Sequence, residues 1–151
     1  MTTAQMTAVS AAITTLLTTT AIPRIGTFWV EQGGVYAGIV AGENGEPDHH
    51  LIHAAAEHEI FDADWETAIE KAQTPINGFN DWSLPDRREA RLLAINCRDS
   101  FDLDDWYWTA TQYAYDVAYA WVQNFTNGDQ DGYHESNLYR ARAVRRLSII
   151  Q

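Results

Sequence analysis

The stretch from Val117 to Phe125, VAYAWVQNF, alternates between two sets of side chains over its whole length. A period of two places each set on one face of an extended chain, which is typical of a half-buried strand. Asn127-Gly128 follows directly, and this pair is favoured in hairpin turns because both residues tolerate positive φ. The chain must therefore build part of its structure as a sheet, and we predict that this strand pairs antiparallel with a later one.

The loop after this strand, FTNGDQDGYHES at 125–136, also has features of a calcium loop. Asn127, Asp129 and Asp131 stand at alternate positions before Gly132, as in an EF-hand. The position of the bidentate Glu is taken by Leu138, and the preceding segment is a predicted strand rather than a helix. Turn formation explains these residues better than calcium. We expect no metal and no cofactor, with calcium as the remaining alternative.

The other periodic segments predict an α+β chain. Strands are expected at 27–30, 35–40, 49–56, 106–111 and 140–147. One helix should begin after Asp62 or Asp64, because apolar side chains from Trp65 to Ala72 recur at helical spacing. A second should begin after Asp86, where Glu89 completes a capping box. Cys97 follows on that helix and is expected to be a buried small hydrophobe.

The first 22 residues contain no charged side chain and are rich in Thr and Ala. Met6, Val9, Ile13 and Leu16 are spaced three, four and three apart, as in a heptad seam, so we predict a short helical segment at 1–23. The seam is too short to hold a coiled coil alone. Packing on its own domain, oligomerisation through residues 1–22 and a flexible tail all remain open. Residues 24–151 are predicted to form one domain.

The formal charge of −11 is unevenly spread, since no Lys or Arg occurs from Ile25 to Glu70. Such a surface repels phosphate, so direct nucleic-acid binding is not expected. The acidic side chains either keep the protein soluble or form a face that imitates nucleic acid. The candidates for that face are Glu57, Glu59, Asp62 and Glu66. Positive charge gathers instead at Arg87, Arg88 and Arg91 and at Arg140, Arg142, Arg145 and Arg146, where any anion site should lie.

Four histidines, His49, His50, His53 and His58, raise the question of zinc. In a strand His49 and His53 lie too far apart to share one ion, and no HExxH motif is present. The first residues lack the basic start and the continuous apolar run of a secretory leader, so we expect none, and no stretch approaches the run of about 20 apolar residues that a membrane span needs. We therefore expect neither a zinc site nor a membrane span.

Several ordered phrases resemble the Lcl C-terminal domain family of bacterial and phage proteins, from about Arg24 to Leu147. They are GFNDWSLPDRREARLL, YWTATQY, AYAWVQNFTNGDQDGY and RARAVRRL, which begin at positions 78, 107, 118 and 140. The resemblance implies a C-type-lectin-like fold, with two helices around a twisted, mainly antiparallel sheet and long loops. It also implies that Trp82, Trp108 and Trp121 fill the core and that Arg145 reaches a carboxylate or a loop carbonyl across the fold.

Relatives of this fold include calcium-dependent lectins and formylglycine-generating enzymes, but their sites do not carry over. Glu46-Pro47-Asp48 echoes the lectin loop in the wrong part of the chain, and one cysteine cannot supply the oxygen-activating site. An enzyme would have to be a glycosidase that takes one of its two catalytic carboxylates from the cluster Asp102, Asp104 and Asp105. A solvated loop is the simpler explanation, so we expect no enzyme activity.

The sequence therefore favours a non-enzymatic binding module, encoded by a phage or prophage, that recognises a protein or glycan through its C-terminal loops. It is expected in the host cytoplasm or in a phage particle, where it could belong to a virion or tail receptor-binding module. The alternative is an acidic inhibitor that blocks a host defence or DNA-binding protein by imitating nucleic acid. The candidate contact residues are Tyr113, Tyr115, Asn127, Asp129, Gln130, Asp131, Tyr133, His134 and Asn137.

Overall fold

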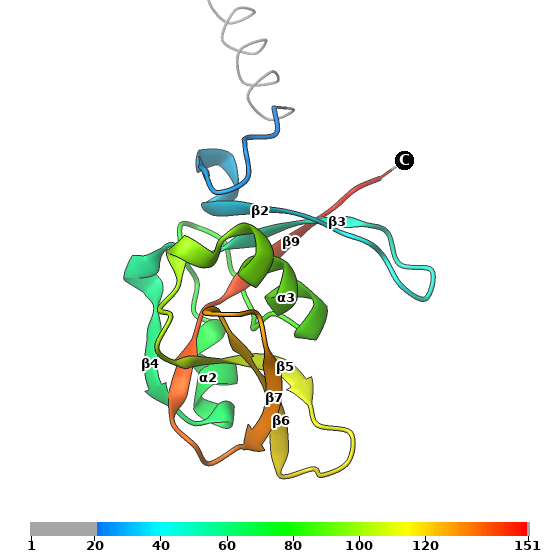
Figure 1. Cartoon of the computed structure of the whole chain (residues 1–151). Coiled ribbons are helices and arrows are strands. Elements are labelled where there is room, and N and C mark those ends of the chain that lie inside the picture. Colours follow the sequence, from blue (N-terminus) through cyan, green and yellow to red (C-terminus); the bar gives the residue numbers. More distant parts are fainter. Residues whose placement is uncertain (1–20, 151) are drawn as a thin grey trace, which may run out of the picture.

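Pairing between distant strands organises residues 21–150, the part of the chain that the computed structural model describes, into two β-sheets (Figure 1). The strands are β1 Phe28–Trp29, β2 Gly34–Val40, β3 His49–His53, β4 Ile60–Ala63, β5 Trp106–Gln112, β6 Tyr119–Asn124, β7 Gln130–His134, β8 Tyr139–Ala141 and β9 Val144–Ser148. The helices are α2 Trp65–Ala72 and α3 Arg87–Asn96. The predicted α+β class is confirmed. Of the predicted helical segment 1–23, residues 1–20 lie outside the described part.

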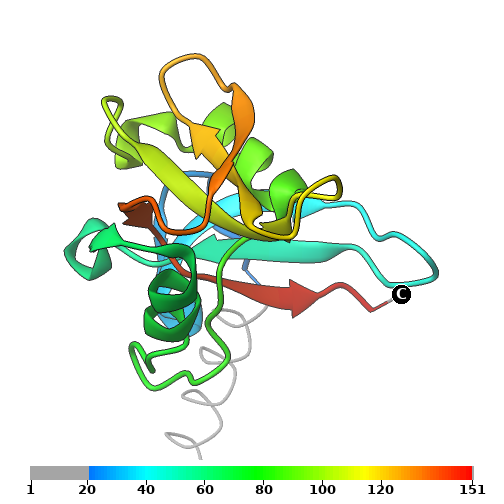
Figure 2. The ribbon, with the colours of Figure 1, turned by 90° about the horizontal axis from the view of Figure 1, so that it is seen from below.

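The two sheets replace the single twisted sheet that the sequence predicted. One has the order β1-β2-β3-β9 and the other β4-β8-β5-β6-β7. All pairs are antiparallel except β5 with β8. Figure 2 shows the strands of the two sheets in separate layers, with β5 to β7 on one side and β2, β3 and β9 on the other.

The expected last strand, 140–147, is divided between these sheets. Tyr139–Ala141 pairs with β4 and β5, whereas Val144–Ser148 pairs with β3. The chain crosses from one sheet to the other at Arg142 and Ala143, both of which are buried. The prediction of one strand with two alternating faces was therefore wrong, because residues 141–145 are buried whichever face they belong to.

Both helices begin at the predicted caps. The Asp64 carboxylate accepts a hydrogen bond from Thr67 N at 2.8 Å. Asp86 and Glu89 form a complete capping box, with N–H···O distances of 2.8 and 2.9 Å. Helix α3 packs against β2, β5 and β6, and so lies between the two sheets, while α2 packs against β4, β5 and β8. Within residues 21–150 no helix is long and apolar enough to cross a membrane.

Large aromatic side chains fill two hydrophobic cores. Trp82 and Trp108 are fully buried in the first, and their indole N–H groups donate to the carbonyls of Ile76 and Ala63. Phe101 and Phe125 stack in the second, with ring centroids 4.0 Å apart. Cys97 belongs to that core as expected, and burial raises the pKa of its thiol to about 11. The prediction for Trp121 was wrong, since this side chain is only half-buried.

Buried arginines connect the loops to the sheets. Arg145 donates to the Asp81 carboxylate at 2.6 Å and to the Gln32 carbonyl at 2.7 Å, which confirms the contact expected for it. Arg142, 2% exposed, donates to Glu59 at 2.8 Å and to the carbonyls of Ala54 and Ser100. All three nitrogens of its guanidinium therefore donate hydrogen bonds within the fold.

Glu59 is the acidic partner at the centre of this arrangement, and its side chain is 5% exposed. Besides Arg142, it lies 3.4 Å from Arg140 and accepts a hydrogen bond from the Tyr107 hydroxyl. Glu59 was wrongly assigned to an exposed acidic face, because the two arginines that bind it come from a distant part of the sequence.

Replacing Glu59 by Gln should destabilise the fold by about 3 kcal/mol, since the buried charge of Arg142 would lose its counter-charge. Chemical denaturation of the purified chain measures this change. The matched control is Glu57→Gln, because the Glu57 side chain is 77% exposed and should contribute little. Equal stability of both variants would contradict a structural role for Glu59.

His53 is a second buried polar group with a consequence for stability. Its Nδ1 donates to the Ala54 carbonyl at 2.7 Å, and its Nε2 has no hydrogen-bond partner. Burial lowers the pKa of His53 to about 4. The neutral ring is therefore the form that fits between its neighbours, which include Phe101 with ring centroids 5.2 Å apart.

Stability should fall as the pH falls from about 6.5 to about 4, because the unfolded state takes up the His53 proton first. The expected loss is about 3 kcal/mol, complete below the folded pKa. Denaturation of the wild type and of His53→Gln across this pH range isolates the contribution of His53 to the free energy of unfolding, since the two proteins share every other titrating group. A variant with the same pH slope as the wild type would refute this assignment.

Candidate functional site

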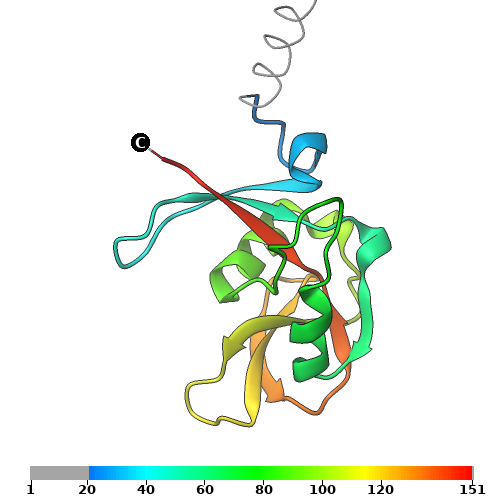
Figure 3. The ribbon, with the colours of Figure 1, turned by 180° about the vertical axis from the view of Figure 1, so that it is seen from behind.

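The loop at 113–118 between β5 and β6 projects beyond the five-stranded sheet, as Figures 1 and 3 show. Its ends are fixed by a hydrogen bond from Tyr113 N to the Tyr119 carbonyl at 2.8 Å. Asp116 shapes the tip, because its backbone carbonyl accepts from Tyr119 N and its carboxylate accepts from Ala118 N. The loop is thus ordered while Tyr115 and Val117 remain 88% and 79% exposed.

Aromatic side chains continue from this loop along the outer face of β6 and β7. We call Tyr113, Tyr115, Tyr119, Trp121 and His134 the tyrosine face. The Tyr113 ring contacts Tyr115 and Trp121, with centroids 5.6 and 4.9 Å apart, and Tyr119 contacts His134 at 5.5 Å. These contacts hold the rings next to one another, so the face is preorganised.

Helix α3 supplies a cation to one end of the tyrosine face. The Arg87 guanidinium lies 3.4 Å from the centroid of the Trp121 ring, in a cation–π contact. Gln130 fixes that guanidinium, because its side-chain oxygen accepts from Arg87 Nε at 3.0 Å and its amide donates to the Arg87 carbonyl at 2.7 Å. Gln130 was predicted as a ligand contact, but its hydrogen-bonding groups are used within the fold.

The structure separates the predicted contact residues into three groups. Tyr113, Tyr115 and His134 lie together on the tyrosine face, which the sequence grouping indicated. Tyr133 points to the opposite side of β7, where its ring packs against Trp106 and Tyr139 with centroids 5.4 and 5.7 Å apart. Asn137 also lies on that side, and its amide is 3.4 Å from the Tyr139 hydroxyl.

The remaining predicted contacts belong to the turn and edge of the β6–β7 hairpin. Asn127 and Asp129 bond to each other, with Asp129 N donating to the Asn127 side-chain oxygen at 3.0 Å. Asp131 accepts from Gly132 N at 2.8 Å. Strand β6 does pair antiparallel after the turn, but its partner is β7, which begins at Gln130 inside the stretch predicted as loop. The predicted partner, the strand at 140–147, pairs with β3, β4 and β5 instead.

Packing explains Gly132, which had looked like part of a calcium loop. A Cβ atom on Gly132 would lie 2.6 Å from the Tyr113 ring, so only glycine lets this ring rest on β7. Among residues 21–150 no three His, Cys, Asp or Glu side chains are grouped in a way that could hold a metal ion. The absence of a cofactor stays a prediction.

Tyr119, Trp121 and Arg87 were not predicted as parts of this surface. The period of two had already placed Tyr119 and Trp121 on one face of the strand. The opposite face, with Ala120 and Val122, is buried, and the face of Tyr119 and Trp121 becomes buried only farther along the strand, at Gln123. Large aromatics were assumed to be core, whereas here the small residues face the core and the rings cover the outside.

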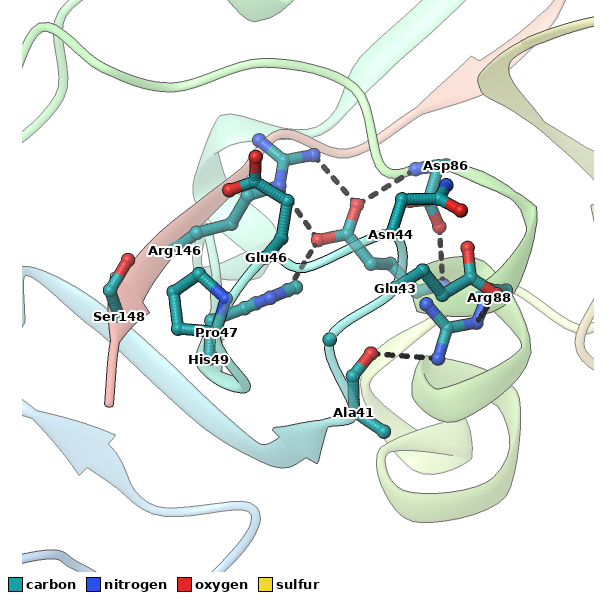
Figure 4. Close-up of a pocket in the computed structure, with 12 residues that line it drawn as sticks. Ala41, Glu43, Asn44, Glu46, Pro47, His49, Asp86, Arg88, Arg146 and Ser148 are labelled. Atoms are coloured by element: carbon teal, nitrogen blue, oxygen red, sulfur yellow. Dashed lines mark hydrogen bonds and ion pairs between the residues drawn. The ribbon is translucent and has the colours of Figure 1, made fainter. Parts of the chain in front are cut away.

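A hollow of about 390 Å³ lies between the 41–47 loop and helix α3, apart from the tyrosine face (Figure 4). Glu89 is a buried residue of its lining, and it accepts hydrogen bonds from Arg146 at 2.7 Å and pairs with His49 Nε2 at 2.8 Å. Burial alone would raise the pKa of the Glu89 carboxyl, but the bonds from Arg146 hold it below its ordinary value. Arg88 pairs with Glu43 at 3.2 Å. The charged side chains around the hollow are thus paired with one another, so we interpret the hollow as part of the structural framework rather than as a ligand site.

The carboxylates considered for a glycosidase lie elsewhere and share a single cation. Asp102 and Asp105 both pair with Arg140, at 3.2 and 3.4 Å. Asp104 is exposed, and its backbone N–H donates to the Asp102 carboxylate. Two of the three carboxylates are thus used in ion pairs within the fold.

Comparison with known proteins agrees with the resemblance seen in the sequence. The family model for the Lcl C-terminal domain matches residues 29–145. No curated protein matches the chain.

Tyr115 and Tyr133 should respond oppositely to truncation, although both were predicted to contact a ligand. Tyr133→Ala should destabilise the fold by about 2 kcal/mol, because its ring is packed against the core. Tyr115→Ala should change the stability little, because the ring is exposed. Thermal unfolding of both variants measures the difference. Loss of stability in Tyr115→Ala alone would contradict the placement of both rings.

Proposed function

Because the chain belongs to the Lcl C-terminal domain family, we propose that it is a non-enzymatic binding module with a C-type-lectin-like fold. The observation that carries the proposal is the ordered loop at 113–118, which holds Tyr115 almost fully exposed beside a preorganised aromatic surface. Exposed aromatic side chains on a fixed loop offer large contact area at low entropic cost. A fold gains nothing from exposing them, so we assign them to recognition.

The proposed ligand is a protein or a glycan that contacts the tyrosine face. Tyrosine rings stack on apolar surfaces, including the C–H faces of sugars, while their hydroxyls and His134 can exchange hydrogen bonds with polar groups. Arg87 adds a positive charge at one end. The hairpin holds these groups on paired strands, whose positions are better fixed than those of loops alone.

The acidic side chains considered for nucleic-acid imitation are not part of this proposed binding surface. Glu59 is neutralised by Arg140 and Arg142, which leaves Glu57, Asp62 and Glu66 of the proposed nucleic-acid imitation exposed. We therefore propose recognition through rings rather than through an array of carboxylates. We further propose that the protein is phage or prophage encoded and acts in the host cytoplasm or as part of a phage particle.

Combined replacement of Tyr115, Tyr119 and His134 by Ser should reduce ligand binding at least about tenfold, because these side chains supply the exposed contact area. The measurement is binding of the labelled full chain to a glycan array and to whole bacterial cells. The matched control is Ile150→Ser, since Ile150 is 91% exposed and lies at the far end of β9.

A second variant, with Glu57, Asp62 and Glu66 changed to Lys, gives the opposing test. If this variant loses binding while the tyrosine variant keeps it, the acidic surface is the binding site and the proposal is wrong.

A further inference from the structure

Positive charge without a carboxylate partner is concentrated at helix α3. Five of the ten basic side chains pair with Asp or Glu: Arg88, Arg140, Arg142, Arg145 and Arg146. Within residues 21–150, the other five have no carboxylate oxygen within 4.0 Å, and three of these, Arg87, Arg91 and Arg98, stand close together in the sequence, whereas Arg24 and Lys71 lie apart. The chain carries 21 acidic residues, so nearby carboxylates are not scarce. Their absence here leaves a cationic surface on an acidic protein.

The helix tolerates a like-charge pair at this place. Arg87 and Arg91 stand four residues apart on α3, a spacing at which equal charges repel. One neutral group bridges them, the Gln130 side-chain oxygen, which accepts from Arg87 Nε and from Arg91 Nη2 at 3.0 Å each. Burial and the charge of Arg91 both lower the pKa of Arg87. An anion that bound here would relieve this repulsion.

Aliphatic side chains lie between these cations. Ile95 is 71% exposed and Ile39, on the neighbouring strand β2, is 53% exposed. Two hollows lie beside this part of α3, and Arg91 and Ile95 line both of them. One, of about 360 Å³, reaches the 125–128 turn, and the other, of about 270 Å³, reaches Ile39.

We propose that this surface, which we call the α3 face, docks an acidic protein segment that carries aliphatic side chains. The α3 face consists of Ile39, Arg88, Arg91, Leu92, Ile95 and Arg98. Asp or Glu side chains of the partner pair with Arg91 and Arg98, and a Leu- or Ile-like side chain enters a hollow beside Ile95. The charge complementarity and the grooves on either side of a helix identify the partner's chemistry. No residue of the α3 face belongs to the tyrosine face, although Gln130 connects Arg91 to Arg87, which contacts Trp121. The inference does not depend on binding at the tyrosine face.

The apolar component favours a protein segment over an acidic polysaccharide. Sugars bind most effectively by stacking on flat aromatic rings, whereas the side chains of the α3 face are branched and aliphatic. Such side chains pack best against the aliphatic side chains of a peptide. An acidic polysaccharide would pair with the arginines but would leave Ile39 and Ile95 uncovered.

Fluorescence anisotropy of labelled synthetic peptides built from Glu and Leu, titrated with the full chain, tests the proposal. We expect binding that weakens as salt screens the charges. Arg91→Gln combined with Arg98→Gln should weaken binding about tenfold, and Ile95→Ser should weaken it about fivefold. The matched control is Lys71→Gln, because Lys71 is an exposed cation at the end of α2. Amide shifts in NMR spectra should locate the peptide on α3.

Three results would overturn the proposal: no peptide binding, binding unchanged in the arginine and Ile95 variants, or an oligogalacturonate of equal charge binding as tightly as the peptide. The last would identify a surface that selects charge alone. If the arginine variant does not fold, Ile95→Ser decides the outcome, since it leaves all charges in place. A charge-reversal experiment gives a further test: the variant Arg91→Glu with Arg98→Glu should bind a peptide of Lys and Leu, which the wild type should not bind.

Discussion

The crossing of the chain at Arg142 and Ala143 is the feature on which the rest of the structure depends. At this point the backbone leaves one sheet and enters the other, and the buried Arg142 donates to Glu59 and to two carbonyls of different loops. A long, fully charged side chain there can satisfy groups from several directions, which an apolar residue cannot. The cost is a buried ion pair whose members depend on each other. The two sheets are therefore held by a polar joint as well as by their cores.

The sequence predicted elements whose signals are local and failed where distant contacts decide. Both helices could be predicted because Asp64, Asp86 and Glu89 act within one turn of the residues they cap. Strand β7 could not, because Asp and Gly do not favour strands, and its pairing with β6 and the ring of Tyr113 over Gly132 overcome that preference. The division of the last strand depends on which neighbours it meets in each sheet, which no local pattern encodes.

The candidate site shows the same limit for individual side chains. Tyr113 and Tyr115 were predicted to be contact residues because they lie in the segment 101–135, whose loops are rich in Tyr, Trp, Asn and Asp, and were expected to be exposed; they do lie on the outer surface. Tyr133 and His134 are adjacent in sequence, but only His134 faces outward, since a strand turns consecutive residues to opposite sides. Trp121 shows that the larger side chains of an alternating strand need not be the buried ones. The assignment depends on the helix that covers the sheet.

The loop at 113–118 is anchored through backbone groups at its two ends, and the side chains of Tyr115 and Val117 take no part in that anchoring. Tyr115 and Val117 can therefore change with little effect on folding, in the same way that antibody loops vary on a constant framework, whereas the Tyr113 ring and the Asp116 carboxylate are used within the fold. Selection for a new target could act on these positions while the buried arginines and the helix caps stay as they are. The residues that the fold requires are thereby different from those that can vary for recognition.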